Sequence, residues 1–278
     1  MEKLEIKTPC KINLGLRVIR KRPDGYHDIE TIFYPINLFD KLTFELSDSF
    51  SFDTNNSLIK SEETNSVTAA LRKLEELTGR KFQVKVYLEK NIPIGAGLGG
   101  GSSDGAAALT GLNKLFELKL SEDELKRIAL GIGSDTPFFI EPKPSFAESR
   151  GEVLKAVDFN IEFPILIINP GIHVSTKWAY ESLTIDSGKK NHLEYESLLS
   201  KDWNEIKNHL KNDFEEVVFL KYPEIKNIKD KLYESGALFS LMTGSGSTVF
   251  GIFPDITSAI NAGSKFPEDY FRFIHYLK

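Results

Sequence analysis

Glycine is concentrated in one short segment of this 278-residue chain, and that segment constrains the fold more than any other feature. Six of the 20 glycines fall within residues 95–105, and residues 93–104 read P-I-G-A-G-L-G-G-G-S-S-D. A strand-like alternation at residues 82–88 precedes the segment, and an alanine- and leucine-rich stretch at residues 106–115 predicts a helix after it. The sequence therefore predicts a strand, a bare loop and a helix start in succession.

A loop of this kind suits an anion. Backbone N–H groups in the loop and at the helix start would point at the ligand, and side chains would only block its approach. Six glycines also cost more backbone entropy than a tight turn that needs one or two of them. We therefore predict a phosphate-binding loop in preference to a turn without a ligand.

Two familiar nucleotide-binding motifs do not fit the segment. Gly95, Gly97 and Gly100 satisfy G-x-G-x-x-G, but the preceding strand alternates and residues 91–93 separate it from the glycines. A dinucleotide fold also needs an acidic residue about twenty positions further on, where Glu117 is a poor candidate. A Walker A loop is excluded, because no glycine–lysine pair is followed by serine or threonine.

The overall charge excludes one class of phosphate-binding protein. The 35 basic and 40 acidic residues give a net charge of −5, so the attraction that nucleic-acid binders use is absent from the whole chain. Any phosphate ligand must be held locally. The single cysteine, Cys10, cannot form an internal disulfide, and no run approaches the roughly 18 apolar residues of a membrane span. We expect a cytoplasmic protein that binds neither nucleic acid nor membrane. The histidine spacing predicts no zinc site, and no metal-ligating residue is assigned.

Apolar periodicity predicts an α+β protein. Residues 8–18 alternate as a half-buried strand with Lys11 and Asn13 on its polar face. Cap residues at Asn65 or Ser66 and at Ser121 predict helix starts. The last part of the chain has the order of a split-βαβ sheet. Further helices are expected at 66–77, 121–131, 203–219, 223–234 and 255–264, and further strands at 28–46, 165–168, 237–243, 248–253 and 270–276.

Four segments carry a resemblance to a known family. They are the glycine loop at 93–103, P-C-K-I-N-L at 9–14, R-P-D-G-Y-H at 22–27, and I-G-S-D-T-P-F-F at 132–139. Together they resemble the superfamily named after galactokinase, homoserine kinase, mevalonate kinase and phosphomevalonate kinase. The glycine loop is specific to the superfamily as a whole, whereas D-G-Y-H selects one branch. That branch uses ATP to phosphorylate the 2-hydroxyl of 4-diphosphocytidyl-2-C-methyl-D-erythritol in the non-mevalonate route to isoprenoids.

The resemblance implies a fold and leaves two functional alternatives open. We expect two domains: residues 1–160 as an N-terminal mixed α/β kinase domain with a left-open cleft, and residues 161–278 as a C-terminal split-βαβ, ferredoxin-like domain. Another small-molecule kinase of the superfamily, such as homoserine or mevalonate kinase, is the nearest alternative. A nucleotide-binding protein without turnover is the second.

The resemblance also assigns two catalytic residues. Asp135 would take the proton from the attacking hydroxyl, although an aspartate before Thr-Pro is by itself more often a turn residue. Lys11 would orient Asp135, ease deprotonation of the hydroxyl or neutralise the transferring phosphoryl group; its alternative is a solvated strand lysine. A lysine nearby would weaken Asp135 as a base, which a loose phosphoryl-transfer transition state tolerates.

Ligand-binding positions follow from the same resemblance. Trp178 is an alternative to Tyr180 for stacking on the cytosine. For Asn65, the alternative to binding ATP is a purely structural role as a helix cap. Mg²⁺ is expected with ATP, with its ligands unassigned, and the chain is expected to be a monomer or a weak homodimer. The implied ATP-binding residues are Pro93, Gly95, Gly97, Leu98, Gly99, Gly100, Gly101, Ser102, Ser103 and Asn65, and the implied substrate-binding residues are Asn13, Tyr26, His27, Thr176 and Tyr180.

Overall fold

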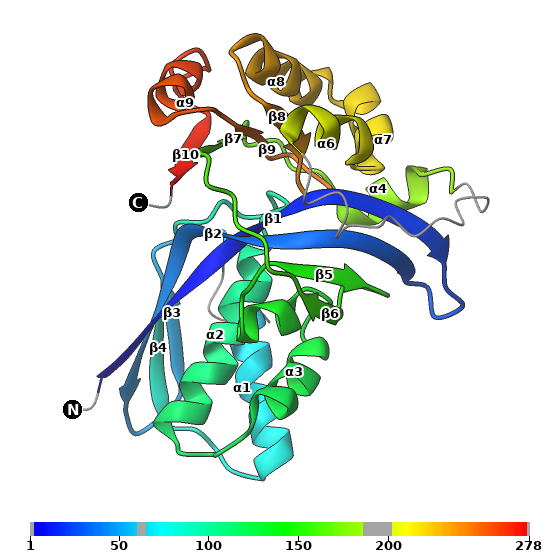
Figure 1. Ribbon diagram of the computed structural model, residues 1–278. Coiled ribbons are helices and arrows are strands. Elements are labelled where there is room, and N and C mark those ends of the chain that lie inside the picture. The colour runs from blue at the N-terminus through cyan, green and yellow to red at the C-terminus, as the bar shows by residue number, and fades with distance from the viewer. Residues whose placement is uncertain (1–2, 60–64, 186–201, 277–278) are drawn as a thin grey trace. The chain divides into compact units, whose positions relative to one another are not determined.

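The protein is described by a computed structural model that covers residues 3–59, 65–185 and 202–276 (Figure 1). The chain forms two compact units that interleave along the sequence. Unit 1 comprises residues 1–10, 38–94 and 99–142, and unit 2 comprises residues 11–37, 95–98 and 143–278. The predicted division into consecutive domains, 1–160 and 161–278, stays a prediction.

Two long paired strands contribute residues to both units. β1 spans Lys3–Lys21 and β2 spans His27–Leu46, so residues 28–46, where one or two strands are expected, form a single strand, and the strand expected at 8–18 is longer. β1 passes from unit 1 to unit 2 after Cys10, and β2 passes from unit 2 to unit 1 after Asn37. Each unit is therefore built on part of each strand.

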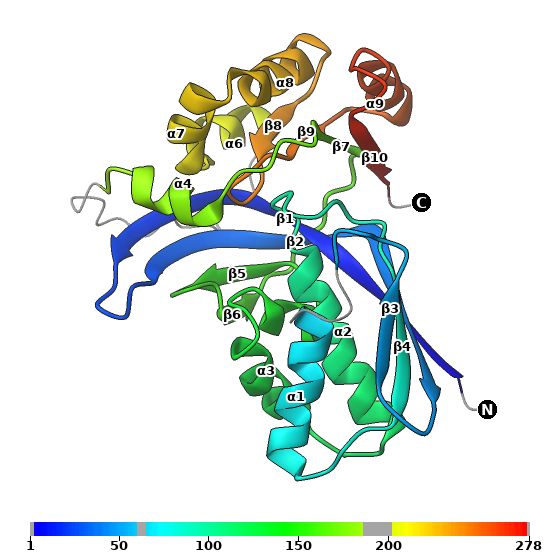
Figure 2. The ribbon, with the colours of Figure 1, turned by 180° about the vertical axis from the view of Figure 1, so that it is seen from behind.

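Unit 1 places helices against strands (Figure 2). β4 pairs antiparallel with the second half of β2 and parallel with β3, a strand that the sequence did not predict. Their inward side chains form one core with three of the helices. Gly111 allows α2 to approach β2, because a Cβ there would lie 2.4 Å from the ring of Phe44. The remaining elements of unit 1 are β3 (Ser51–Thr54), β4 (Val84–Glu89), α1 (Ser66–Thr78), α2 (Gly100–Leu115), α3 (Glu122–Leu130) and the 3₁₀ helix η1 (Thr136–Ile140).

Helix boundaries in unit 1 follow local sequence signals, with one exception. Asn65 caps α1, Gly79 ends it in the left-handed conformation, and Ser121 begins α3 with a capping box, as the sequence predicted. The exception is α2. Its N-cap is Gly99, so Ser102, Ser103 and Asp104 lie inside the helix and do not cap it.

Unit 2 contains the predicted split-βαβ sheet. Its four strands lie in the order β10-β7-β9-β8 with every neighbouring pair antiparallel, which is the ferredoxin-like arrangement. The first half of β2 also pairs with β5, which pairs with β6. The elements are β5 (Ser145–Glu148), β6 (Val153–Ala156), β7 (Ile165–Asn169), α4 (Thr176–Ser182), α6 (Trp203–His209), α7 (Phe214–Lys221), α8 (Pro223–Glu234), β8 (Phe239–Met242), β9 (Val249–Ile252), α9 (Ile256–Gly263) and β10 (Phe271–His275).

The single helix predicted at residues 203–219 is wrong, because the chain breaks between α6 and α7. Asn212 occupies the break. Its side-chain oxygen accepts the N–H of Phe214, and its Nδ2 donates to the carbonyls of Met242 (2.7 Å) and Gly244 (2.8 Å). Because these partners lie thirty residues away in sequence, apolar periodicity alone could not indicate the break.

The structure also bears on the membrane expectation. Within the described ranges, none of the helices has the length and apolar character needed to cross a bilayer.

Candidate active site

The start of α2 is an uncapped helix N-terminus. Its N-cap, Gly99, has φ 73° and provides no side-chain hydrogen bond. The first helical bond runs from the N–H of Ser103 to the carbonyl of Gly99, so the N–H groups of Gly100, Gly101 and Ser102 precede the helical ladder. These groups and the positive end of the helix dipole can bind an anion.

The structure explains most glycines of the loop without a ligand. Gly95, Gly97 and Gly99 have positive φ values of 66°, 78° and 73°. Gly100 has no room for a Cβ, because one would lie 2.8 Å from Lys90 Nζ. Gly101 differs from all of these: it is exposed, and its nearest neighbour would be Ser66 Oγ at an ordinary 3.6 Å. A helical glycine costs about 1 kcal/mol relative to alanine, so its bare backbone favours close approach of a ligand.

The first half of the loop, residues 95–98, packs on a second turn within unit 2. A Cβ on Gly97 would lie 2.3 Å from the carbonyl oxygen of Thr243, and one on Gly244 would lie 3.0 Å from the carbonyl oxygen of Gly97. The N–H of Thr248 donates to the carbonyl of Ala96 at 3.3 Å. The two turns therefore touch backbone to backbone, and neither can carry a side chain at the contact.

Lys11 is buried in unit 2, which contradicts its alternative as a solvated strand lysine. It is 3% exposed, and its Nζ donates to Asn13 Oδ1 at 2.6 Å and to the carbonyl of Gly97 at 3.2 Å. Its backbone N–H donates to the carbonyl of Leu98. The ammonium of Lys11, which was expected to neutralise phosphoryl charge, is therefore hydrogen-bonded to the glycine loop itself.

The side chain of Asn13 forms its hydrogen bonds within the protein. Its Oδ1 accepts from Lys11 Nζ and from the N–H of Gly244, and its Nδ2 donates to Thr31 Oγ1. The side chain is only 1% exposed. Asn13 therefore connects Lys11 with the turn at Gly244, and its predicted hydrogen bond to the substrate remains a prediction.

Asp135 precedes η1 in unit 1. It occupies the N-cap position of that helix, within a turn, and its side chain makes no capping hydrogen bond. Its catalytic role therefore stays a prediction, as does the alternative of a turn residue. The residue is half-buried. Just before it, a Cβ on Gly133 would lie 3.5 Å from Ser102 Oγ, so the segment that carries Asp135 runs beside the first turn of α2.

Ser103 faces the core of unit 1, away from solvent. Its hydroxyl donates to the carbonyl of Pro9 at 2.5 Å and also contacts the hydroxyl of Thr8. Its N–H begins the helical ladder. The neighbouring Ser102 is half-exposed, and of the two predicted serines it is the one with a hydroxyl open to a ligand.

The predicted cytidine-binding residues lie together in unit 2. The rings of His27 and Tyr180 stack with centroids 4.4 Å apart and planes 14° from parallel. Burial lowers the pKa of His27, and Lys21 adds to this effect. Tyr26 is 49% exposed, with the guanidinium of Arg150 3.9 Å from its ring centroid.

Trp178, the alternative to Tyr180, makes a different set of ring contacts. Trp178 packs edge-to-face on Tyr222 and lies under Lys221, so the stack with His27 belongs to Tyr180.

Thr176 contacts Ser245 through their hydroxyls at 2.9 Å, which connects the start of α4 with the glycine turn at 244–246.

Asn65 fulfils the helix-capping role that the sequence left open for it, and its role in binding ATP stays a prediction. Its Oδ1 caps α1 by accepting from the N–H groups of Val67 and Thr68 at 3.0 Å. Its Nδ2 is buried and has no hydrogen-bond partner among the described residues. Asn65 therefore caps α1, and its side-chain Nδ2 could donate a hydrogen bond to a ligand.

Sequence reasoning missed a buried ionic cluster beside the loop. Lys90 Nζ contacts the carboxylate of Asp40, and lies 3.0 Å from Asp104 Oδ2. Burial raises the pKa of Asp104 to about 7. A signal was present: Lys90 continues the inward register of Val84, Val86 and Leu88 on β4, where a charged side chain needs a partner.

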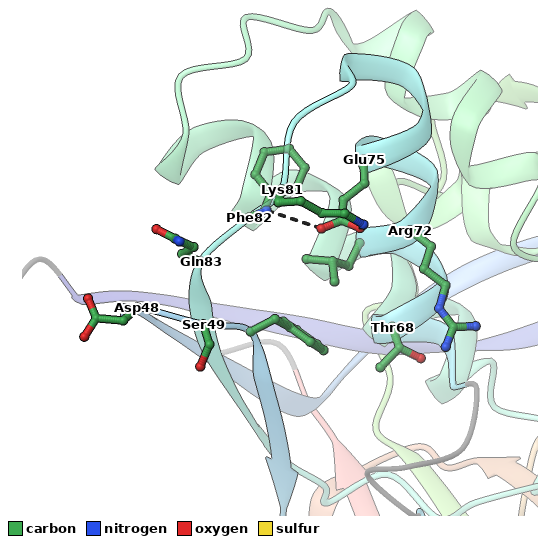
Figure 3. Close-up of a pocket in the computed structure, with 10 residues that line it drawn as sticks. Asp48, Ser49, Thr68, Arg72, Glu75, Lys81, Phe82 and Gln83 are labelled. Atoms are coloured by element: carbon green, nitrogen blue, oxygen red, sulfur yellow. Dashed lines mark hydrogen bonds and ion pairs between the residues drawn. The ribbon is translucent and has the colours of Figure 1, made fainter.

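A cavity of about 520 Å³ lies elsewhere in unit 1 (Figure 3). Phe50, Leu71 and Phe82 provide apolar walls, and Glu75 accepts hydrogen bonds from Lys81 and from the N–H of Phe82 at its edge. None of the predicted site residues lines it, so it is not part of the candidate active site.

Comparison with protein families and known proteins shows which family the chain resembles. The family models described as "GHMP kinases N terminal domain" and "GHMP kinases C terminal" match residues 65–141 and 195–271. A 4-diphosphocytidyl-2-C-methyl-D-erythritol kinase of Thermodesulfovibrio yellowstonii is 42% identical over 277 residues, which covers 96% of this chain and 95% of that protein. One from Chlorobium phaeobacteroides is 38% identical over 275 residues, covering 97% and 96%.

Solved structures give the same result. The crystal structure of a 4-(cytidine 5'-diphospho)-2C-methyl-D-erythritol kinase has a TM-score of 0.82 at 30% identity and covers 98% of each chain. Homoserine kinase from Cytophaga hutchinsonii has a TM-score of 0.74 at 17% identity, covering 100% of this chain and 95% of that one, and this likeness shows the fold alone.

Proposed function

This chain belongs to the GHMP kinases, and among them to the 4-diphosphocytidyl-2-C-methyl-D-erythritol kinases; from that premise we propose how its residues act. The reaction is the ATP-dependent phosphorylation of the 2-hydroxyl of 4-diphosphocytidyl-2-C-methyl-D-erythritol, a step in isoprenoid synthesis. The structural observation that carries the assignment of the ATP site is the uncapped start of α2, with exposed Gly101 in its first turn.

The glycine loop would hold the phosphates of ATP. The N–H groups of Gly100, Gly101 and Ser102 supply donors without a helical partner, and the helix dipole adds partial positive charge. Asn65 would contribute its Nδ2, which has no hydrogen-bond partner in the described part of the chain, to the nucleotide. Binding through backbone N–H groups explains how a chain with a net charge of −5 can bind a polyanion, because the positive potential of the helix start does not depend on the net charge of the protein.

Asp135 and Lys11 would serve the transfer itself. The substrate hydroxyl oxygen forms a bond to the γ-phosphorus, the bond from that phosphorus to the bridging oxygen breaks, and ADP leaves. Asp135 accepts the hydroxyl proton, and the buried ammonium of Lys11 neutralises developing negative charge. Positioning and charge neutralisation count for more than base strength in such a loose transition state.

The aromatic group in unit 2 would bind the cytidine end of the substrate. His27 and Tyr180 stack on one another, and Tyr26 presents an exposed ring on which the base could stack. Stacking of a base on an aromatic side chain contributes about 1–3 kcal/mol. Thr176 would complete the pocket from the start of α4.

Mg²⁺ would enter with ATP. The described ranges contain no group of three or more His, Cys, Asp and Glu side chains that could hold a metal ion by themselves. Mg²⁺ is commonly bound by substrate phosphates, waters and one or two carboxylates, so this chain fits a metal delivered with the nucleotide. When bound it would neutralise phosphate charge, and no protein ligand is assigned to it.

A coupled ADP-release assay tests the proposed function. The purified protein is offered ATP with 4-diphosphocytidyl-2-C-methyl-D-erythritol, homoserine or mevalonate in separate reactions. We expect ADP release with the cytidyl substrate alone. Activity on homoserine or mevalonate alone would reassign the enzyme within the superfamily, and ATP binding without ADP release from any of the three would indicate a non-catalytic nucleotide-binding protein.

A further inference from the structure

Three charged side chains meet in the interior of unit 1. Asp40 comes from β2, Lys90 follows β4, and Asp104 lies one turn into α2. The side chains are 0%, 3% and 4% exposed. Lys90 Nζ contacts Asp40 Oδ2 and lies 3.0 Å from Asp104 Oδ2, so one ammonium joins a strand to a helix.

The cluster also holds the segment that leads into the glycine loop. The second oxygen of Asp40 accepts the N–H of Asn91 at 2.6 Å and the N–H of Ile92 at 2.8 Å. Asp40 therefore fixes the backbone before the loop, while Asp104 fixes the helix after it. Lys90 lies between these two attachments.

Lys90 lies directly beneath the first residue of α2. A Cβ built on Gly100 would be 2.8 Å from Lys90 Nζ and 2.9 Å from Ile92 Cγ2. The ammonium thus occupies the space that any larger residue would need at the helix start. Glycine at this position is explained by the lysine, and the lysine is in turn adjacent to the N–H groups proposed for the phosphates.

An arrangement of this kind is costly to maintain for stability alone. Buried ion pairs often contribute no more than well-packed apolar residues of similar volume. Moreover, Asp104 Oδ1 has no hydrogen-bond partner among the described residues. An apolar contact would hold α2 against β2 more simply, which points to a demand for exact placement of the helix start.

We propose that Lys90 is a positioning residue for ATP: by joining Asp40 to Asp104 beneath Gly100, it sets where the first turn of α2 presents its N–H groups to the phosphates. The proposal rests on the proposed function of the loop. It concerns position, because the cluster sets one ammonium against two carboxyl groups and so offers the phosphates no net positive charge. The cluster acts through the backbone and does not itself touch the nucleotide.

Kinetic constants of three variants test the proposal. Asp104→Ala removes the attachment of α2 but leaves Lys90 paired with Asp40, so the variant should fold. We expect its KM for ATP to rise about tenfold, the scale of one lost hydrogen bond to a charged group, with the KM for the cytidyl substrate unchanged. Asp104→Asn keeps an oxygen for Lys90 and should restore most of the affinity. Lys90→Met should raise the KM for ATP further.

A matched control and a second readout separate position from general stability. Lys85→Met removes an exposed lysine from β4 and should leave all constants unchanged. If Asp104→Ala lowers the melting temperature while its KM for ATP equals that of the wild type, the cluster is purely structural and the proposal is wrong. Should Lys90→Met fail to fold, the two Asp104 variants decide.

Direct binding of ATP, measured by calorimetry without the second substrate, distinguishes this proposal from the proposed function. A wild-type protein that binds ATP but releases no ADP would overturn the function and leave the positioning test intact. Equal ATP affinity in the wild type and Asp104→Ala would overturn the positioning role, whatever the substrate proves to be.

Discussion

A Cβ atom on Gly97 would lie 2.3 Å from the carbonyl oxygen of Thr243. This contact joins the first half of the glycine loop to the turn at residues 243–246, and Asn13 reinforces it by bonding to Thr243 and Gly244. The shape of the loop in unit 2 is therefore set by a backbone segment that lies almost 150 residues further along the chain.

Replacing Gly97 with alanine should destabilise the protein strongly. The positive φ alone costs about 1–2 kcal/mol for a residue with a Cβ, and displacement of the Thr243 turn adds to it, so we expect about 3 kcal/mol in all. Gly171→Ala is the matched control, because Gly171 has a similar φ of 75° with nothing within 4 Å of its Cβ. Denaturant unfolding of both variants gives the difference; equal losses would show that the contact contributes nothing.

Gly101→Ala should separate stability from ATP binding. The residue is helical and exposed, and its Cβ would make only an ordinary contact, so alanine should raise the free energy of unfolding by up to about 1 kcal/mol. We expect the KM for ATP to rise several-fold all the same, because the methyl group would stand where the phosphates approach. A variant that is more stable and binds ATP as well as the wild type would remove Gly101 from the site.

Asp135→Asn should lower kcat by at least ~100-fold with little change in affinity for ATP, the usual loss for a positioned proton acceptor. Asparagine has nearly the same size and shape as aspartate, so the melting temperature should change little. The competing interpretation, a turn residue, predicts the opposite pattern: a lower melting temperature with turnover near that of the wild type. Measuring kcat and melting temperature on the same preparation decides between them.

Tyr180→Ala should raise the KM for the cytidyl substrate by about tenfold, in line with the contribution of one stacking ring, without changing the KM for ATP. Tyr180→Phe keeps the ring that stacks on His27 and should remain close to the wild type. Trp178→Ala should have the smaller effect, because that ring packs on Tyr222 and Lys221. A larger effect at Trp178 would reassign the stacking residue.

Local sequence signals predicted the parts of the fold that depend on neighbouring residues. The cap at Asn65, the left-handed stop at Gly79 and the capping box at Ser121 each involve residues within a few positions of one another, and all three are confirmed. The break at Asn212 was not predictable in this way, because its amide bonds to the distant residues Met242 and Gly244.

The same distinction between local signals and tertiary contacts applies to the candidate site. The glycine loop was recognisable from composition alone, since six glycines in eleven residues exceed what one tight turn needs. The burial of Lys11 was not, because the alternation of β1 places it on the polar face and only tertiary packing covers that face. Asp40 and Lys90 lay within reach of sequence reasoning: each sits in the inward register of an alternating strand, where an unpaired charge is unstable.

The stability of the protein should depend on pH through His275. The ring is 2% exposed, and burial lowers its pKa to about 4 from the usual 6.5. Its Nδ1 accepts the N–H of Asn37 at 3.0 Å, a bond that only the unprotonated nitrogen can make. Between pH 6.5 and about 4 the unfolded chain therefore binds a proton that the folded chain does not.

Stability should consequently fall as pH decreases through that window, by up to about 3 kcal/mol from this one group. His275→Asn keeps an acceptor for the N–H of Asn37 but cannot titrate, so its free energy of unfolding should decline less between pH 6.5 and 4. Denaturant unfolding at several pH values measures both proteins, and parallel curves for the wild type and His275→Asn would show that the pKa of His275 is the same in the folded and unfolded states.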